Sequence, residues 1–410
     1  MSGQHFRFLQ SGQFALDQPL TGIAEIPDAL AEILVDAPFD SAQRVFDSAI
    51  EERVDFVVLT GDLLDLAQPA PRALAFLLEQ FERLAAQGIT AYWAGGRSDP
   101  AADWPATVTL PKSVHIFPTQ QVEELSHFRG SRPVANIIGR SWHGTASVQV
   151  GDVSSDDDGL TTVVVGYGQA KAEHLGEQMV DYWALGGQAE RETLGTKQRV
   201  IHYAGRPQGR SPQDSGPHGC TLVHVAGDRA MRSQFTPTDA VRWQLEKVAL
   251  EPGETLEGAR QKLAESAKQL RAEAGNRPLL VHWKITGGSH LAGPAARQDL
   301  AAEWQEWLRK DFFLSGGKPA LWTHKVELDH AELPEVWFAE DSMLGEFLRN
   351  LRDLKGAELS DLYLDVEIPA HHRTPALASL GQWSRDEQLE VLEEVGLTGA
   401  QLLGAADREA

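Results

Sequence analysis

Cysteine is almost absent from this 410-residue chain: Cys220 is the single one, so no disulfide can form within it. Such cysteine usage is typical of reducing compartments, and we expect the protein in the cytoplasm. No stretch approaches the roughly 20 consecutive apolar residues that a membrane-spanning helix needs. Residues 1–9 contain no apolar core of signal-peptide length, so we expect neither a membrane segment nor a secretion signal.

Basic residues are also scarce. Lys and Arg number 37 against 59 Asp and Glu, which gives a formal net charge of −22. Such a surface repels polyanions over a Debye length of about 10 Å at moderate salt. Whole-chain binding to nucleic acid is therefore disfavoured, while a local basic groove stays open. Hydrophobic residues make up 42% of the chain, enough for sizeable cores, and its length predicts two or three domains.

The N-terminal part alternates between predicted strands and helices. Phe6–Leu9 is a short apolar run suited to a first strand, and residues 13–39, with several Pro and Gly, are predicted as loop. Asp40 is a predicted helix cap. A second helix begins at Pro71, and a strand follows over Ile89–Ala94. Strand, helix and strand with short links form a βαβ unit, which predicts an α/β domain.

Strand-like runs dominate the second half of a first domain, which we place over residues 1–250. The predicted strands are Val114–Phe117, Val134–Ile138, Thr161–Val165, Tyr182–Leu185, Val200–Tyr203, Thr221–Val225 and Trp243–Leu250. Composition then shifts, and alternating helices and strands predict a small α+β cap over residues 251–335. Residues 336–410 form a predicted helical tail, with helices beginning near Asp341 and Ser384. This tail either docks a partner or packs on its own protein.

The functional interpretation depends on the apolar run Phe56–Leu59 and the turn after it. The run predicts a strand buried on both faces, and Gly61, Asp62 and Asp65 follow directly. Strand ends that open into Gly-containing turns are where α/β sheets place ligands and chemistry. The G-D-x-x-D pattern therefore has two interpretations: the bridging-aspartate motif of two-metal phosphoesterases, or an ordinary turn.

A second stretch carries a more specific signal. Residues 203–210 read Y-A-G-R-P-Q-G-R, and residues 215–223 read S-G-P-H-G-C-T-L-V. They closely resemble the Y-P-G-x-P-Q-G-R and E-T-G-P-K-G-C-Y-L-V segments of the SbcD-type DNA repair exonuclease subunit, in the calcineurin-like metallophosphoesterase superfamily. Residues 181–186, D-Y-W-A-L-G, resemble the approach to that family's last metal motif. The resemblance covers approximately residues 5–250 and, more faintly, the cap.

The resemblance implies a four-layer αββα metallophosphoesterase sandwich with a small α+β cap domain and a helical C-terminal tail. It also implies a binuclear metal site, but most of the expected ligand positions hold other residues. The first motif, D-x-H, falls on Gln13 and Ala15; G-N-H-D falls on Gly96, Arg97, Ser98 and Asp99; the fourth-motif histidine falls on Gly166 or Tyr167; and G-H-x-H falls on Gly186, Gly187, Gln188 and Ala189. Of the ligands that the family leads us to expect, only Asp62 remains in kind.

A two-metal phosphoesterase holds its cations about 3.5–4 Å apart, one to make hydroxide and both to bind the phosphate. Each ion needs several oxygen or nitrogen donors, and Ala and Gly side chains supply none. We therefore expect no intact catalytic residue and no bound cofactor. We also expect Arg97 to form an ion pair with Asp62 in the vacated centre. Asp65 and Asp99 are then predicted as turn and capping residues.

The leading interpretation is a catalytically degenerate, SbcD-like pseudoenzyme that acts as a binding or scaffolding subunit. By resemblance its partner is an SbcC-like coiled-coil ATPase, met through residues 341–410, and a homodimer stays open. The alternative is an active phosphodiesterase or DNA exonuclease that uses manganese or another divalent metal at a rearranged or single-metal site. That site would draw its ligands from Asp62, Asp65, Asp99 and a histidine such as His143, His174 or His202. A third interpretation is that Arg97 holds a small anion without turning it over.

Overall fold

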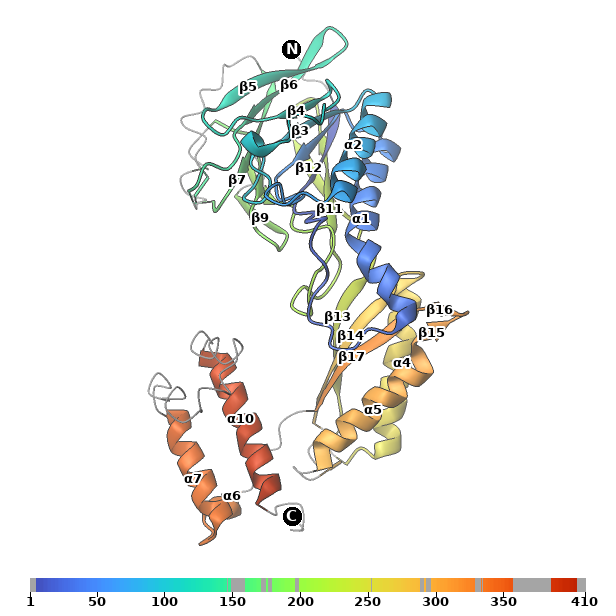
Figure 1. The fold of residues 1–410 in the computed structure, drawn as a ribbon, viewed down its shortest axis with the longest axis vertical. Coiled ribbons are helices and arrows are strands. Elements are labelled where there is room, and N and C mark those ends of the chain that lie inside the picture. Colours follow the sequence, from blue (N-terminus) through green and yellow to red (C-terminus); the bar gives the residue numbers. More distant parts are fainter. Residues whose placement is uncertain are drawn as a thin grey trace. The chain divides into compact units, whose positions relative to one another are not determined.

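The computed structural model describes residues 5–145, 147–148, 159–170, 175, 179–195, 199–251, 253–287, 291–292, 296–328, 333, 335–356 and 385–403. The chain divides into two compact units (Figure 1). Unit 1 comprises Met1–Gln244, Ala274–Leu280 and Gly316–Ala320, and unit 2 comprises Leu245–Glu273, Val281–Ser315 and Leu321–Ala410. The domain boundaries that we placed after residues 250 and 335 stay predictions.

Unit 1 contains two six-stranded sheets. The first has the order β12-β11-β1-β2-β3-β4, with β1 Phe6–Ser11, β2 Phe56–Leu59, β3 Thr90–Trp93, β4 Val114–Ile116, β11 Gly219–Val225 and β12 Met231–Pro237. The second has the order β5-β6-β7-β8-β10-β9, with β5 Glu123–Arg129, β6 Arg132–Gly139, β7 Thr161–Tyr167, β8 Tyr182–Gly186, β9 Glu192–Gly195 and β10 Val200–Tyr203. Each sheet has a run of four parallel strands, β1 to β4 and β6, β7, β8 and β10. The predicted α/β class is confirmed.

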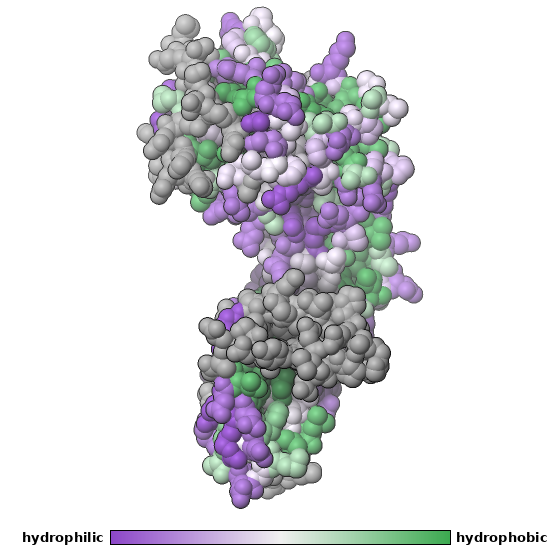
Figure 2. All heavy atoms as spheres, turned by 60° about the vertical axis from the view of Figure 1, so that its left-hand side comes forward, coloured by the Kyte–Doolittle hydropathy of each residue, from purple (hydrophilic) through white to green (hydrophobic). Residues whose placement is uncertain are grey.

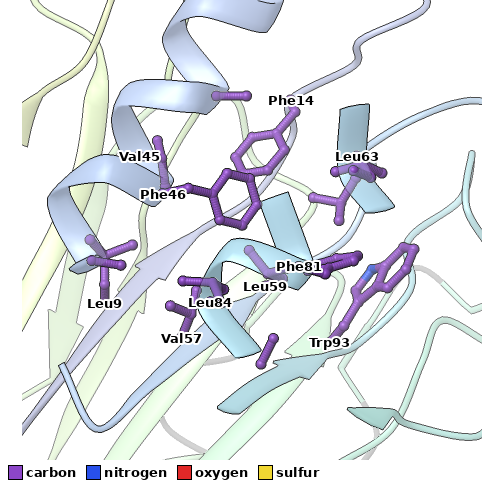
Figure 3. Packing of buried hydrophobic residues seen from close by; sticks show 14 of the residues in the cluster. Leu9, Phe14, Val45, Phe46, Val57, Leu59, Leu63, Phe81, Leu84 and Trp93 are labelled. Atoms are coloured by element: carbon purple, nitrogen blue, oxygen red, sulfur yellow. The ribbon is translucent and has the colours of Figure 1, made fainter. Parts of the chain in front are cut away.

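Two helices cover one face of the first sheet (Figure 1). They are α1 Asp28–Glu51 and α2 Pro71–Ala86; a short 3₁₀ helix, η1 Ala101–Asp103, follows β3. Beneath them lies an aromatic-rich core that includes Phe14, Phe46, Phe81 and Trp93 (Figure 3). The Phe46 ring stands edge-on to Phe14 and Phe81, with ring centroids 5.7 and 6.0 Å apart. Because aromatic side chains bury large apolar areas, this core is a main source of stability in unit 1.

Helix α1 shows that our loop prediction for residues 13–39 is wrong in its second half. The helix begins at Asp28 and continues through Pro38, so Asp40 lies inside it and the prediction that Asp40 caps a helix is also wrong. A proline inside a helix removes a hydrogen bond and costs about 3 kcal/mol or more, which is why the local sequence argues against a helix. Burial of Leu30 and Leu34, at helical spacing and 1% and 4% exposed, helps to offset that cost.

A second core joins the two sheets face to face. The Phe8 and Phe56 rings stack at a centroid distance of 5.1 Å, and Tyr182 of the second sheet meets Phe8 edge-on, also at 5.1 Å. The buried Gln10 amide crosses between the sheets: its Nε2 donates to the His202 carbonyl at 3.0 Å, and Tyr182 donates to its Oε1 at 2.7 Å. The layer order is therefore helix, sheet, sheet.

The predicted fourth layer, helices over the outer face of the second sheet, stays a prediction. Leu175, Val180 and Trp183 belong to an apolar cluster together with Ile138 of β6 and Ile201 of β10. Residues 171–174 and 176–178 lie outside the described residues.

Most of a three-stranded sheet, β13-β14-β17, belongs to unit 2. Its elements in chain order are β13 Arg242–Ala249, α4 Leu256–Ala274, β14 Leu279–Thr286, α5 Arg297–Phe312, the two-residue strands β15 Leu314–Ser315 and β16 Lys318–Pro319, and β17 Leu321–Leu328. This confirms the predicted alternation of helices and strands. Three further helices, α6 Glu335–Phe338, α7 Met343–Gly356 and α10 Arg385–Leu402, gather around Trp337, Leu344, Leu348 and Ala400.

None of the helices in the described ranges combines the length and the apolar character needed to cross a lipid bilayer. Figure 2 shows one face of the molecule, on which hydrophilic residues are widespread and hydrophobic ones form smaller groups between them.

Candidate functional site

The candidate site forms where β1 and β2 end. The segment after β1 runs beside the turn after β2, because Gln13 N donates to the Gly61 carbonyl at 2.7 Å and Ala15 N to the Asp62 carbonyl at 3.0 Å. Gln13, Ala15 and Asp62 all have left-handed backbones, with φ of 52°, 45° and 55°. Such a φ is uncommon for residues other than Gly, and it is often found at functional sites. The turn therefore brings three of the motif positions together.

Glycines allow the surrounding loops to approach this turn closely. A Cβ on Gly96 would lie 2.5 Å from Asp62 Oδ1, and a Cβ on Gly186 would lie 1.8 Å from the Thr60 carbonyl oxygen. A side chain at Gly96 would push the loop after β3 away from Asp62, and one at Gly186 would push the end of β8 away from Thr60. The two glycines thus allow the loop after β3 of the first sheet and the end of β8 of the second sheet to approach the turn after β2.

The Asp62 carboxylate accepts hydrogen bonds from two hydroxyl side chains. The Tyr167 hydroxyl donates to Oδ2 at 2.5 Å, while Ser98 donates to Oδ1 from its backbone N at 3.1 Å and from its Oγ at 3.0 Å. Burial raises the pKa of Tyr167, and the bond to Asp62 raises it further, so this hydroxyl remains a donor. Asp62 is therefore bound by neutral donors of the protein itself.

The two candidates for the fourth-motif position, Gly166 and Tyr167, have different surroundings. A Cβ on Gly166 would meet the side chains of Val148 and Leu185, whereas the Tyr167 side chain reaches Asp62. Tyr167 is the residue that faces the candidate site. From the sequence we named Ser98 only as the replacement of the family's leaving-group histidine, and Tyr167 only as one of two candidates for a replaced ligand. Their bonding to Asp62 was missed, although both carry a hydroxyl.

The predicted ion pair between Arg97 and Asp62 is wrong. Among the ion pairs of the described residues, none joins these two side chains within 4.0 Å. Arg97 is exposed, and its guanidinium lies 5.9 Å from the centre of the Trp142 ring. Because Ser98 and Tyr167 already satisfy Asp62, the charge of Arg97 can stay hydrated at no cost.

The Asp99 carboxylate links the turn after β2 to the loop after β3. It is fully buried, and it accepts backbone N–H bonds from Asp62 at 2.7 Å, Gly96 at 2.6 Å and Leu63 at 2.9 Å. Burial raises the pKa of Asp99 to about 7, with the neighbouring Asp62 carboxylate adding to the rise and the backbone bonds opposing it. These bonds make Asp99 a capping residue of the two loops.

Asp65 bonds its own turn. Its Oδ1 accepts from Ala67 N at 2.9 Å, and its backbone N donates to Asp17 Oδ2 at 2.8 Å. Burial raises the pKa of Asp17. These local bonds are those of an Asx turn.

The last motif contributes backbone only. Gly187 has a left-handed backbone with φ of 92°, and a Cβ there would lie 3.2 Å from the Tyr167 ring. The Ala189 carbonyl accepts a bond from Arg206 N at 3.0 Å. Gly187 has no side chain and the Ala189 methyl group cannot bind a metal, so neither position supplies a side-chain ligand.

Of the histidines that the alternative site would need, His202 is buried and bonds Thr193 Oγ1 and Thr221 Oγ1, each at 2.8 Å. Burial lowers its pKa to about 3. His143 bonds the Thr145 hydroxyl at 3.1 Å, and His174 lies outside the described residues. Within the described ranges, no three His, Cys, Asp or Glu side chains come together as a metal site would require. The donor set does not fit two cations.

The stretch that carries the family resemblance is a structural brace. The buried Gln208 side chain accepts from Ala240 N at 2.8 Å and donates to the Val241 carbonyl at 2.6 Å. Asp214 Oδ2 accepts from the backbone N of Arg210 and of Ser211, at 2.8 and 3.2 Å. The Gln208 bonds hold the segment after β10 against the chain that leads into β13, and the Asp214 bonds fix the turn within that segment.

Comparison with known proteins finds two sequence matches. Residues 243–331 match the family model described as the middle domain of metallophosphoesterase YhaO. The uncharacterized metallophosphoesterase YhaO of Bacillus subtilis (strain 168) is 28% identical over 295 residues, which cover 68% of this chain and 71% of that protein. Over these ranges, this chain is similar to metallophosphoesterases. The narrower SbcD-type likeness concerns only the segments quoted above.

Distant solved structures are similar as well. They are the TT1561 protein of Thermus thermophilus, 11% identical with a TM-score of 0.33, and vacuolar protein sorting 29 of Cryptosporidium parvum, 14% identical with a TM-score of 0.28. Each aligns over 57% of this chain, and over 99% and 97% of the respective structure. Because these TM-scores are low, the fold assignment depends on the sequence matches and on the two sheets.

Proposed function

We propose that this protein is a catalytically degenerate metallophosphoesterase that acts as a binding or scaffolding subunit. The supporting observation is at Asp62, the single family ligand that remains in kind. Its Oδ1 accepts a hydrogen bond from the Ser98 hydroxyl, and its Oδ2 accepts one from the Tyr167 hydroxyl. Hydrogen-bond donors and cations compete for the same carboxylate lone pairs. A cation at this position would therefore have to displace the protein's own donors without help from neighbouring ligands.

Metal analysis tests the proposal directly. After growth with manganese, we expect substoichiometric metal in the purified protein and no manganese-dependent hydrolysis of bis(p-nitrophenyl) phosphate. Stoichiometric metal, together with hydrolysis that Asp62→Ala abolishes, would overturn the proposal and favour the phosphodiesterase alternative.

A variant in which metal-binding side chains are returned to the motif positions tests the same proposal. Gln13→Asp, Ala15→His, Ser98→His and Tyr167→His together return donors to the positions around Asp62. We expect this variant to bind manganese more tightly than the original chain. The matched control keeps Tyr167 and carries the other three changes; it should bind the metal more weakly, because the tyrosine hydroxyl still engages Asp62.

For the partner, we propose an SbcC-like coiled-coil ATPase in a DNA-repair-type complex, docked through residues 341–410. The most exposed apolar side chains among the described residues of this region are Met343 of α7 at 74% and Leu402 of α10 at 80%. Exposed apolar side chains on a helix pair are suited to a helical partner. Their exposure supports docking over simple packing.

Co-purification with a tagged ATPase of this type tests the docking site. We expect deletion of residues 341–410 to abolish binding. The double change Met343→Glu and Leu402→Glu, which leaves the buried Leu344 and Leu348 in place, should do the same. The matched control is Val35→Glu on α1, where Val35 is 62% exposed. Unchanged binding by both tail variants would reject this docking site.

A further inference from the structure

A cationic cavity lies at the opposite end of the first sheet from Asp62. Its volume is about 830 Å³, and its wall includes the four arginines Arg7, Arg53, Arg129 and Arg232, two histidines and a single carboxylate, Asp55. The cavity lies where β1 and β2 begin, whereas Asp62 follows the other end of β2. In a chain with a net charge of −22, such a concentration of arginines is unexpected from composition.

Three of the basic side chains form a row across neighbouring strands. Arg7 of β1 is paired with His224 of β11, and His224 is paired with Arg232 of β12. Directly paired residues of antiparallel strands lie on the same face of a sheet. Two residues further along that face, Leu9 and Leu222 are paired in the core beneath the helices. The basic row therefore lies on the helix-covered face of the first sheet, near the end of that sheet and beyond the last turn of α1.

The arginines are only partly neutralised. Arg129 pairs with Asp55 through Nε at 2.7 Å, and Arg7 pairs with Glu52 at 3.2 Å. Asp55 also accepts the backbone N–H of Arg7 at 2.9 Å. For Arg53 and Arg232, the described residues provide no ion pair and no side-chain hydrogen bond. The cavity wall thus presents two uncompensated positive charges.

Arg53 is also placed against its local preference. It follows the last turn of α1 with a left-handed φ of 48°, a position that favours Gly or Asn. The carbonyls at a helix C-terminus attract a cation and account for Arg53 alone. They do not account for Arg232 and Arg129, which come from other strands.

We propose that this cavity binds a small ligand with two or more phosphate groups, of the size of a nucleoside diphosphate. Arginine forks match phosphate oxygens in pairs, and the volume lies within the range of small-molecule sites. The half-buried Met231 and the exposed Ala230 in the same wall supply a small apolar surface for a base or another flat group. The proposal is independent of whether Asp62 binds a metal.

Calorimetric titration of the full chain with ADP, pyrophosphate and inorganic phosphate tests the proposal at low ionic strength. We expect ADP and pyrophosphate to bind more tightly than phosphate, with affinity that falls as salt is added. ADP binding without pyrophosphate binding would assign the affinity to the base and overturn the proposal. Binding of a single-stranded oligonucleotide without ADP binding would do so as well, in favour of a nucleic-acid surface.

Charge-neutralising variants locate the site. Arg53→Gln with Arg232→Gln should weaken pyrophosphate binding by about tenfold or more, since each removes a charge-assisted contact. The matched control is Arg229→Gln, an exposed arginine of the β11–β12 turn outside the cavity wall. An equal loss in the control would show a general charge effect and reject the site. Circular dichroism during urea unfolding confirms that each variant is folded.

Discussion

The carboxylate of Asp62 sits in a half-buried turn with a left-handed backbone. Two neighbours, Ser98 and Tyr167, satisfy it with neutral donors. A buried charge without partners is costly, whereas a charge that accepts several hydrogen bonds is tolerated. Hydrogen bonds to charged groups are also worth more than neutral ones, so this small group contributes to the stability of the turn.

Removing the tyrosine hydroxyl should show this contribution. We expect Tyr167→Phe to lower the free energy of unfolding by about 1.5–3 kcal/mol, the usual value for a hydrogen bond to a charge. In a double-mutant cycle with Asp62→Asn, measured by urea unfolding, the two changes should couple. The comparison variant is Tyr92→Phe, which loses a neutral bond to His127 at 3.0 Å and should cost only about 0.5–1.5 kcal/mol. Equal costs and no coupling would contradict the importance of the Asp62 contact.

His202 predicts a loss of stability in acid. Its pKa is lowered to about 3 in the folded chain, from an ordinary value of 6.5. Below pH 6.5 the unfolded chain takes up a proton that the folded chain does not. Stability is therefore complete above pH 6.5 and falls by up to about 1.4 kcal/mol per pH unit toward pH 3.

Urea unfolding at several pH values measures this slope, and His202→Gln should flatten it. His127, whose pKa burial lowers to about 4, acts in the same direction and remains in the variant. Asp99 acts in the opposite direction between about pH 4 and pH 7, because its folded pKa is raised. An unchanged slope in the variant would rule out the buried neutral His202 as a cause.

Strand ends and glycines, rather than single side chains, build the candidate site. Gly186 closes β8 against Thr60, with no room for a Cβ. We expect Gly186→Ala to cost about 3 kcal/mol or more, since the clash is with backbone and cannot be relieved by a rotamer change. Thermal and urea unfolding measure the loss.

The neighbouring strand offers a matched position. A Cβ on Gly166 of β7 would make ordinary contacts of 3.4 and 3.6 Å. Gly166→Ala should therefore change the free energy of unfolding by less than about 1 kcal/mol. Similar effects of the two alanines would contradict the close approach at Gly186.

Some elements could be predicted from the sequence, and others could not. The strands β6, β7 and β8 were predicted because apolar and β-branched residues dominate them. Edge strands β5, β9 and β12 were missed, since exposed and intermediate positions dominate them. The first half of α1 was missed because Pro38 argues against a helix in the local sequence. The burial that stabilises this helix comes from tertiary packing, which a local pattern does not show.

Charge is distributed unevenly in the molecule. The net charge of −22 works against the compact state through self-repulsion, while the arginine cavity holds a local excess of the opposite sign. Raising sodium chloride from about 10 to 150 mM should therefore raise the melting temperature by roughly 2–5 °C. Choline chloride at equal ionic strength is the control, because screening does not depend on the cation. A fall in melting temperature would contradict net repulsion.

The sequence alone determined the α/β class and the strand that precedes Gly61, and it predicted the loss of metal donors around Asp62. These follow from local patterns, because the spacing of apolar residues and the residue types at motif positions can be read directly from the sequence. Tertiary structure decided which hydroxyls meet Asp62, how α1 passes Pro38, and that Arg7, Arg53, Arg129 and Arg232 share one cavity. Those residues are far apart in sequence, and a periodic pattern indicates which face a side chain occupies but not which neighbour it meets there.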